Sequence, residues 1–305
     1  VQNNTAVDTT KANVANLTFL DGGDVDFTQT GTRNFLQGVL DANGTNKGIT
    51  GWQDGDANNI ALTQNNVKND ALADSVKQKG KSNNLVASQT NTSNATFDVT
   101  QTGDVNLTSL SQAGAGGTVK MDQLGNSNRA AISQTGANSF TGVQVGNAAK
   151  LAAIQSGSGN DINYTGRGNS IVTVNQRASN GTLTAAASTG NVANIDMEGN
   201  AANAALGNAM LLDQIGYNNT ATVYSIFKGK PTLKQGFTLT QYSDNAKGGN
   251  QLQLKGTNAT AGAGSIHVTQ TNGNKANIEL YDGSQAFKLT QVNTSKDVAN
   301  ANTAD

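Results

Sequence analysis

The stretch Val119–Gly136, VKMDQLGNSNRAAISQTG, carries the repeat that decides the fold. Val119 and Met121 alternate with polar residues and lead to Gln123, and the pattern restarts eleven residues later to reach Gln134. Such alternation predicts a strand with one buried face. The Gly and Asn that follow each glutamine tolerate positive φ and predict a tight turn. Two eleven-residue units therefore predict one coil of about 22 residues, a period typical of solenoids.

Glutamine recurs at the end of each predicted strand, and we expect these side chains to stack inward as a ladder. The expected ladder residues are Gln53, Gln64, Gln78, Gln89, Gln101, Gln112, Gln123, Gln134, Gln144, Gln155, Gln176, Gln214, Gln241, Gln270 and Gln291. The expected turn residues are Gly55, Asn58, Gly80, Asn83, Gly125, Asn128, Gly157, Asn160, Gly166, Asn169, Gly216 and Asn219. At one step Tyr164 takes the glutamine position. By the same alternation, Lys120, Asp122 and His267 should face outward.

The composition suits a backbone that is hydrogen-bonded almost everywhere. The 305 residues are 35% hydrophobic and 13% charged, with a formal net charge of −1, while Asn and Gln account for 42 and 22 residues. Low charge argues against disorder driven by repulsion, and amide side chains can form stacked ladders. A net charge near zero gives no attraction to nucleic acid and favours self-association. No apolar run is long enough for a membrane helix, so membrane insertion is not expected.

The chain has no cysteine, which excludes disulfides and thiolate metal sites. It begins at Val1, which we interpret as a processed mature chain and therefore as a sign of secretion. Residues 1–24 are weakly patterned and are expected to form a cap or an inter-subunit strand. Residues 25–295 form one predicted all-β solenoid, with an irregular loop at 35–52 and degenerate repeats at 177–262. Residues 296–305 are expected to fray.

Other residue patterns point to chemistry only weakly. His267 is the only histidine, and its alternation with Ile266 and Val268 favours a solvated position over a catalytic one. Aspartates near 21–26 and 54–56 are the nearest candidates for a glycosidase pair, but solvated loop positions are the favoured interpretation. The segment 157–161 resembles one turn of a calcium-binding array, yet the aspartate does not recur every nine residues. We therefore expect no catalytic residue, metal or cofactor.

The core Gln-x-Gly-x-x-Asn-x-Ala-x-x-x-Gln, carried by Gln123, Gly125, Asn128, Ala130 and Gln134, resembles the repeat of curlin, the subunit of curli fibres. The resemblance spans about 25–291 and is strongest over 53–176. It implies a stacked β-solenoid that forms a secreted, extracellular functional amyloid of the biofilm matrix. It also implies partners of three kinds, which are further copies of the chain, a secretion channel and a nucleator.

The leading functional hypothesis is a structural fibre subunit that polymerises head to tail through open solenoid edges. A soluble solenoid adhesin, including an ice- or glycan-binding protein, is the alternative, and it would carry a capped end and a regular outer face. A β-helix enzyme acting on carbohydrate is a third hypothesis, and it would gather carboxylates on one face.

Overall fold

The computed structural model describes most of the chain as short parallel strands. The described residues are 12–20, 25–30, 32–41, 49–65, 73–93, 96–102, 105–115, 117–125, 127–136, 139–145, 149–156, 160–167, 171–177, 192–200, 209–215, 219–228, 236–242, 251–257, 265–271, 275–281, 286–292 and 303–304. They contain no helix, and they fold as two compact units, Val1–Asn147 and Ala148–Asp305. Each unit is a β-solenoid and is described by itself.

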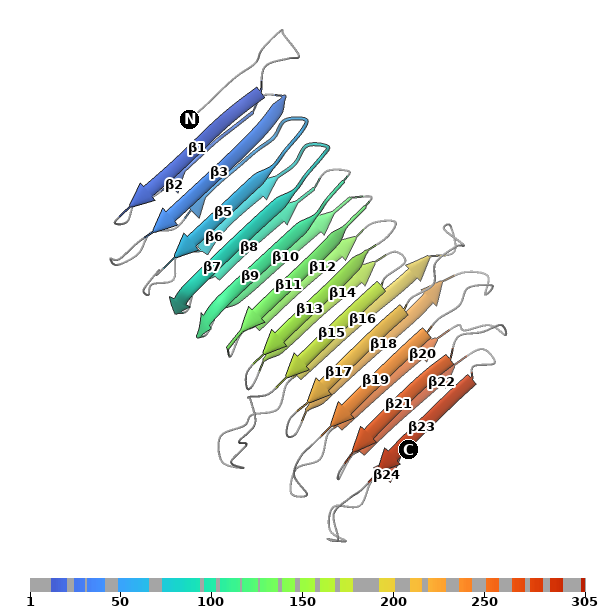
Figure 1. The fold of residues 1–305 in the computed structure, drawn as a ribbon. Coiled ribbons are helices and arrows are strands. Elements are labelled where there is room, and N and C mark those ends of the chain that lie inside the picture. The colour runs from blue at the N-terminus through green and yellow to red at the C-terminus, as the bar shows by residue number, and fades with distance from the viewer. Residues whose placement is uncertain are drawn as a thin grey trace. The chain divides into compact units, whose positions relative to one another are not determined.

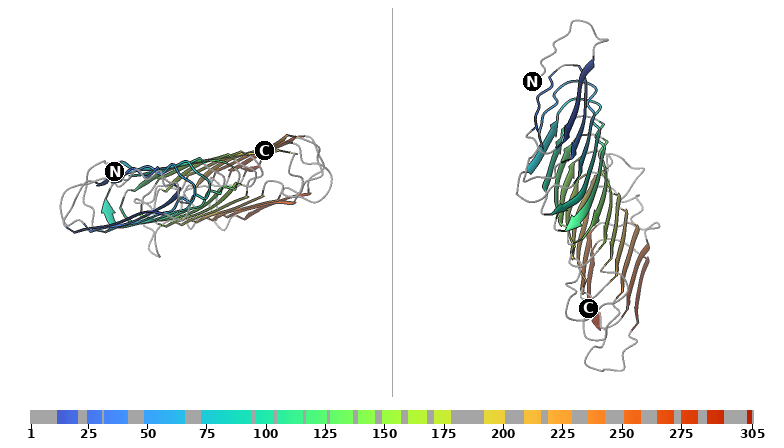
Figure 2. Two further views of the ribbon diagram at one scale, coloured as in Figure 1. Left: turned by 90° about the horizontal axis from the view of Figure 1, so that it is seen from above. Right: turned by 60° about the vertical axis from the view of Figure 1, so that its left-hand side comes forward.

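Unit 1 contains six two-stranded coils within its described residues. Its strands are β1 (Ala12–Leu20), β2 (Val25–Asp26), β3 (Arg33–Asp41), β4 (Ile49–Thr50), β5 (Ile60–Asn65), β6 (Ala73–Gln78), β7 (Leu85–Ser93), β8 (Thr96–Gln101), β9 (Thr108–Ala115), β10 (Thr118–Leu124), β11 (Arg129–Thr135) and β12 (Ser139–Val145). Odd-numbered strands form one parallel sheet and even-numbered strands the other; we call these the odd sheet and the even sheet. The two sheets face each other as layers (Figures 1 and 2).

Unit 2 repeats this arrangement. Its strands are β13 (Lys150–Ser156), β14 (Asp161–Arg167), β15 (Ile171–Arg177), β16 (Val192–Asn200), β17 (Ala209–Ile215), β18 (Thr220–Lys228), β19 (Gly236–Tyr242), β20 (Gln251–Thr257), β21 (Ser265–Thr271), β22 (Lys275–Tyr281), β23 (Ala286–Val292) and β24 (Thr303–Ala304). Its odd and even sheets follow the same rule of pairing between alternate strands. The strands β1 and β24 lie in the terminal segments 1–24 and 296–305.

Strict alternation builds the core between the two sheets. In β10 and β11 every second side chain is buried, and those between are exposed except Thr118, which is intermediate. The register stacks residues of the same kind on neighbouring strands. Val119 pairs with Phe97 and with Phe140, and Gln123 pairs with Gln101 and with Gln144. A slip of one residue would turn each buried face outward, so this pattern specifies the register. The predicted all-β solenoid is thereby confirmed.

Two details of the repeat differ from the sequence analysis. Residues 35–52, interpreted above as a loop, include most of strand β3 and all of β4. In β3 Gly38 aligns with the buried Leu62 of β5 and lies between Leu36 and Leu40, so a glycine interrupts the apolar run and conceals the alternation. Strands β20 and β22 were also missed, because neither ends in glutamine, although Leu252 and Leu254 do alternate.

Candidate functional site

A ladder of buried glutamine amides runs through the even sheet of unit 1. Gln29 Nε2 donates to Gln53 Oε1, Gln53 donates to Gln78, and Gln78 donates to Gln101, each over 2.8 Å. Each of these residues is at most 1% exposed. Successive rungs are separated by 23 to 25 residues, close to the coil length predicted from sequence. The ladder therefore bonds each coil to the next inside the core.

Each rung also closes its own turn. The second hydrogen of Gln53 Nε2 is donated over 2.8 Å to the carbonyl of Asn59, just before the next strand, and Gln78 bonds Asn84 in the same way. The bond forms across longer connections as well, since Gln176 donates to the carbonyl of Val192, sixteen residues away. A buried amide that uses both hydrogens escapes the cost of an unpaired donor, about 1–3 kcal/mol. Glutamine thus joins coils and fixes turn ends together.

The direction of donation reverses at Thr108. Gln101 Nε2 donates to Thr108 Oγ1 over 2.8 Å, and Gln123 Nε2 donates to the same hydroxyl over 2.8 Å from the other side. Gln144 then donates back to Gln123 over 2.6 Å. Thr108 belongs to β9 in the odd sheet and is fully buried, so its hydroxyl crosses the core to link two halves of the even-sheet ladder.

The odd sheet of unit 2 carries a ladder of one polarity. Gln176 donates to Gln155, Gln214 to Gln176, and Gln241 to Gln214, over 2.7 to 3.0 Å. Gln270 and Gln291 continue the same ladder over 2.7 and 2.8 Å. In unit 1, Gln134 donates to Gln112 of the odd sheet over 2.8 Å. Each of these six bonds runs from a glutamine to the glutamine of the preceding coil.

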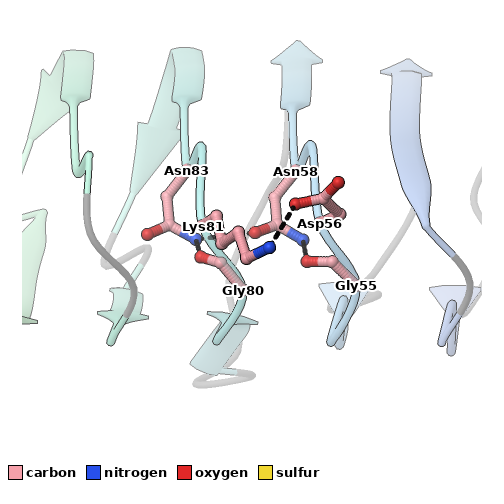
Figure 3. Close-up of polar contacts among 6 residues, drawn as sticks. All are labelled: Gly55, Asp56, Asn58, Gly80, Lys81 and Asn83. Carbon is pink, nitrogen blue, oxygen red and sulfur yellow. Dashed lines mark hydrogen bonds and ion pairs between the residues drawn. The ribbon is translucent and has the colours of Figure 1, made fainter.

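A second ladder of asparagines lies in the turns of unit 1. Asn83 Nδ2 donates to Asn58 Oδ1 over 2.7 Å, Asn106 donates to Asn83 over 2.7 Å, and Asn128 donates to Asn106. Asn58 also donates to the carbonyl of Gly55 over 2.8 Å, and Asn83 donates to the carbonyl of Gly80, so these two asparagines hold their own turns closed. Figure 3 shows two successive turns with this contact and the surface ion pair Lys81–Asp56 at 3.4 Å.

Among the side chains that the structure describes, the buried polar ones are all uncharged. Lys120, Asp122 and His267 are exposed, as their phase predicts. Partial burial raises the pKa of Asp122, and the nearby Asp98 carboxylate raises it further. Burial also raises the pKa of the Tyr164 hydroxyl, which is 2% exposed.

Most of the expected ladder and turn residues occupy the core. Those buried are Gln53, Gln78, Gln101, Gln112, Gln123, Gln134, Gln144, Gln155, Gln176, Gln214, Gln241, Gln270, Asn58, Asn83, Asn128, Asn160 and Asn219. Gly55, Gly80 and Gly125 lie in turns, with φ 148° at Gly125. The side chains of Gln64 and Gln89, and the residues Gly157, Asn169 and Gly216, lie outside the described residues.

The assignment of Tyr164 and Gly166 was wrong. Tyr164 is the second inward residue of β14 and pairs with Ile195, so it does not stand in the glutamine position. Gly166 is buried within the strand at the third inward position, which glutamine takes in β13, and is not a turn residue. The glutamine position of the even sheet continues at Met197 and Ser225. The absence of glutamine there made the later repeats look degenerate.

The bridging role of Thr108 was not predicted from the sequence, where the only signal is a hydroxyl at an otherwise apolar position.

The last coil of unit 2 leaves its interior partly open. Leu289 and Gln291 in β23 are intermediate in exposure, whereas Val268 and Gln270 of the preceding odd strand are 1% and 0% exposed. At the start of unit 1, Gln29 Oε1 is buried and has no hydrogen-bond partner among the described residues. The sheet order begins with β1 and β2 and ends with β23 and β24. The terminal coils are thus the places where further strand pairing could occur.

Comparisons with protein-family models, with curated proteins and with solved structures found no match to this chain. Among the described residues, no helix is both long and apolar enough to span a membrane.

Proposed function

We propose that this protein is the structural subunit of an extracellular, amyloid-like fibre that polymerises head to tail. The observation that carries the proposal is the partly open terminal coil of unit 2, where Leu289 and Gln291 are half-buried. A further coil stacked on β23 would bury these side chains as fully as Val268 and Gln270 are buried one coil earlier. Covering the aliphatic side chain contributes at most about 1.5–3 kcal/mol, since part of it is buried already.

The terminal strand is poorly protected against such pairing. Natural edge strands are usually prevented from pairing with another chain by charge, proline or a bulge. Strand β23, AFKLTQV, contains no proline, and Lys288 is its only charged residue. The outward residues Thr290 and Val292 present no charge. Pairing of unlike ends does not close on itself, so it produces filaments and not rings.

The repeat also explains how a fibre of this kind would keep its register. Amide ladders favour stacking of glutamine on glutamine, because an unpaired buried amide costs about 1–3 kcal/mol. The resemblance to curlin supports the same assembly, and with it secretion through a channel, a nucleating partner and a role in a biofilm matrix. We include these in the proposal.

The first test is to change the C-terminal edge and follow polymerisation of the purified protein by light scattering and electron microscopy. We expect deletion of residues 286–305, or Leu289→Pro, to slow fibre growth severely, because the deletion removes the strand that must pair and the proline interrupts its backbone hydrogen bonds. Lys288→Gln is the matched control, since it changes a side chain of the same strand and leaves every backbone donor in place. It should polymerise at least as fast as the parent.

Circular dichroism must show that the altered proteins keep the strand content of the parent before assembly. The proposal would be overturned if the proline variant, so folded, forms fibres at the parental rate. A parent protein that stays monomeric at high concentration would overturn it equally.

A further inference from the structure

A polar hollow lies on the outer face of the even sheet in unit 2, across β18, β20 and β22, which are neighbours in Figure 1. Its volume is about 240 Å³, and its polar side chains belong to Thr220, Thr222, Gln251, Gln253, Lys275 and Asn277. This volume is below the ~300 Å³ at which pockets for drug-sized ligands begin. The hollow therefore suits one or two small rings of a longer molecule that continues beyond it.

The hollow exists because short and long side chains stand on adjacent strands. Thr220 and Thr222 of β18 are short, while their register partners Gln251 and Gln253 of β20 are long and exposed. The threonines therefore form a floor beside a wall of amides. Hydroxyl and amide groups both donate and accept hydrogen bonds, which is the chemistry needed to bind a ligand rich in hydroxyl groups.

An uncharged row extends from the hollow across the sheet. Asn163, Asn194, Thr222, Gln253 and Asn277 pair strand by strand in register. Asn194 Nδ2 donates to Asn163 Oδ1 over 2.8 Å, so the row is ordered at its far end too. Adjacent strands are about 4.8 Å apart. The row thus presents one hydrogen-bonding side chain per strand to a ligand that lies across the strands.

An aromatic side chain borders this row, and its two charged register neighbours are paired. Tyr224, two residues after Thr222 on the same face of β18, is 37% exposed. Its register neighbours are Asp196 and Lys255. Asp196 bonds Arg167 over 2.7 Å, and Lys255 lies 3.2 Å from Glu279, so both charges are already compensated. A flat amphipathic ring beside neutral donors and acceptors matches the apolar face and polar rim of a sugar.

We propose that this face binds an uncharged polysaccharide. The polymer lies across β18, β20 and β22, its hydroxyl groups bond Thr222, Gln253 and Asn277, and one sugar ring stacks on Tyr224. The five neutral side chains of the hollow favour an uncharged polymer over an acidic one, for which Lys275 alone would supply the attraction. The site is on the outer face and does not depend on the terminal coils, so it would operate in the unassembled protein as well as in a fibre.

Affinity electrophoresis of the unassembled protein, in gels containing soluble neutral glucans with β-1,4, β-1,3 or α-1,6 linkages, tests the proposal. At least one glucan should retard the parent protein. Tyr224→Ala should weaken that binding by about tenfold, the loss expected for an aromatic contact of about 1.4 kcal/mol. Tyr224→Phe keeps the ring and should bind within about twofold of the parent. Gln253→Ala should also weaken binding, because it removes a donor and an acceptor.

Leu211→Ala is the matched control, since Leu211 is 45% exposed and lies on the odd sheet of the same unit. It should bind as the parent does. Three results would overturn the proposal, provided that the variants retain their strand content. These are no retardation of the parent by any glucan, unchanged binding of Tyr224→Ala, and stronger retardation of the parent in a parallel gel that contains an acidic polysaccharide. Because the assay uses unassembled protein, its failure is separate from any failure to polymerise.

Discussion

At the scale of the residue, the glutamine amide forms specific hydrogen bonds both between coils and within its own turn. Gln123 donates to Thr108 and to the carbonyl of Arg129, and its Oε1 accepts from Gln144. An apolar residue could fill the same space but could not bond the turn. A charged residue could not be buried there without a partner. The outer positions can hold charged residues, and the exposed ion pairs there contribute little to the free energy of unfolding.

Substitution of Gln123 measures this role. Gln123→Leu should lower the free energy of unfolding by about 1–3 kcal/mol, because Gln144 Nε2 loses its acceptor. Gln123→Lys should cost more, because it buries an ammonium group. Urea unfolding of the unassembled protein gives the values. The outward Lys120→Gln is the control and should stay within about 0.5 kcal/mol of the parent. Equal stability of the Leu variant and the parent would contradict the ladder argument.

Asp122 gives a prediction for pH. Its pKa is raised in the folded state by partial burial and by Asp98, so between the unfolded and folded pKa values the native state holds more protons. The stabilising contribution of the protonated form is therefore complete below the unfolded pKa and is lost as pH rises through the folded value. Asp122→Asn should raise the melting temperature at pH 7 and change it little at pH 3. A variant that gains equally at both pH values would show that charge is not the cause.

At the scale of the element, the turns are stacked as closely as the strands. A Cβ on Gly80 would lie 1.5 Å from the carbonyl oxygen of Gly55 in the turn below, so this position accepts only glycine without movement of the backbone. Between strands, connections differ in length, yet the glutamine amide still bonds the carbonyl near the start of the next strand, as Gln241 does ten residues on at Gln251. Insertions are therefore tolerated in the longer connections between strands, but not in short stacked turns such as the one at Gly80.

Gly80→Ala tests the stacked turn. We expect a loss of about 1–3 kcal/mol in unfolding free energy, the usual cost of forcing an extra methyl group into a packed site. Ser82→Ala, an exposed position in the same turn, is the control and should be nearly neutral. Thermal unfolding followed by circular dichroism compares the two. A Gly80→Ala protein as stable as the control would mean that the turns can separate at little cost.

At the scale of the whole molecule, the two units share one repeat but distribute their amides differently. Unit 1 has buried glutamines on both sheets, whereas the corresponding positions on the even sheet of unit 2 include Gly166, Met197 and Ser225. The odd sheet of unit 2 keeps its ladder through Gln291 in the last coil. In the proposed fibre, that ladder would end at a joint where another subunit adds its strands.

The proposed axial assembly predicts a specific diffraction pattern. Oriented fibres of the protein should give a reflection near 4.8 Å along the fibre axis and one near 10 Å across it, the spacings of strands and of facing sheets. The axial direction of the first reflection is the informative part, because strands stack along the axis only if subunits join end to end. A 4.8 Å reflection perpendicular to the axis would instead indicate side-by-side association and would exclude the head-to-tail arrangement.

The sequence alone determined the solenoid, the coil length and the inward phase of the glutamines. It could do so because each of these follows from local periodicity, as at Val119, Met121 and Gln123, where alternation within seven residues separates the two faces. The outward position of His267 follows from the same period of two. Turn glycines such as Gly80 were also predictable, because the tight turn needs them wherever it recurs.

Only the tertiary structure decided which residues of different coils meet wherever the repeat departs from glutamine stacked on glutamine. Thr108 looks like any strand threonine in sequence, and its link between Gln101 and Gln123 depends on the facing sheet. Strand β3 and the polar hollow beside Tyr224 were also not predicted from the sequence. The strands that pair to form them lie about one coil apart in the chain, and the connections between those strands vary in length. The physical reason is that alternation within a strand fixes which face a side chain takes. Its neighbours on that face are chosen by the register between strands, and that register is settled only when the whole coil packs.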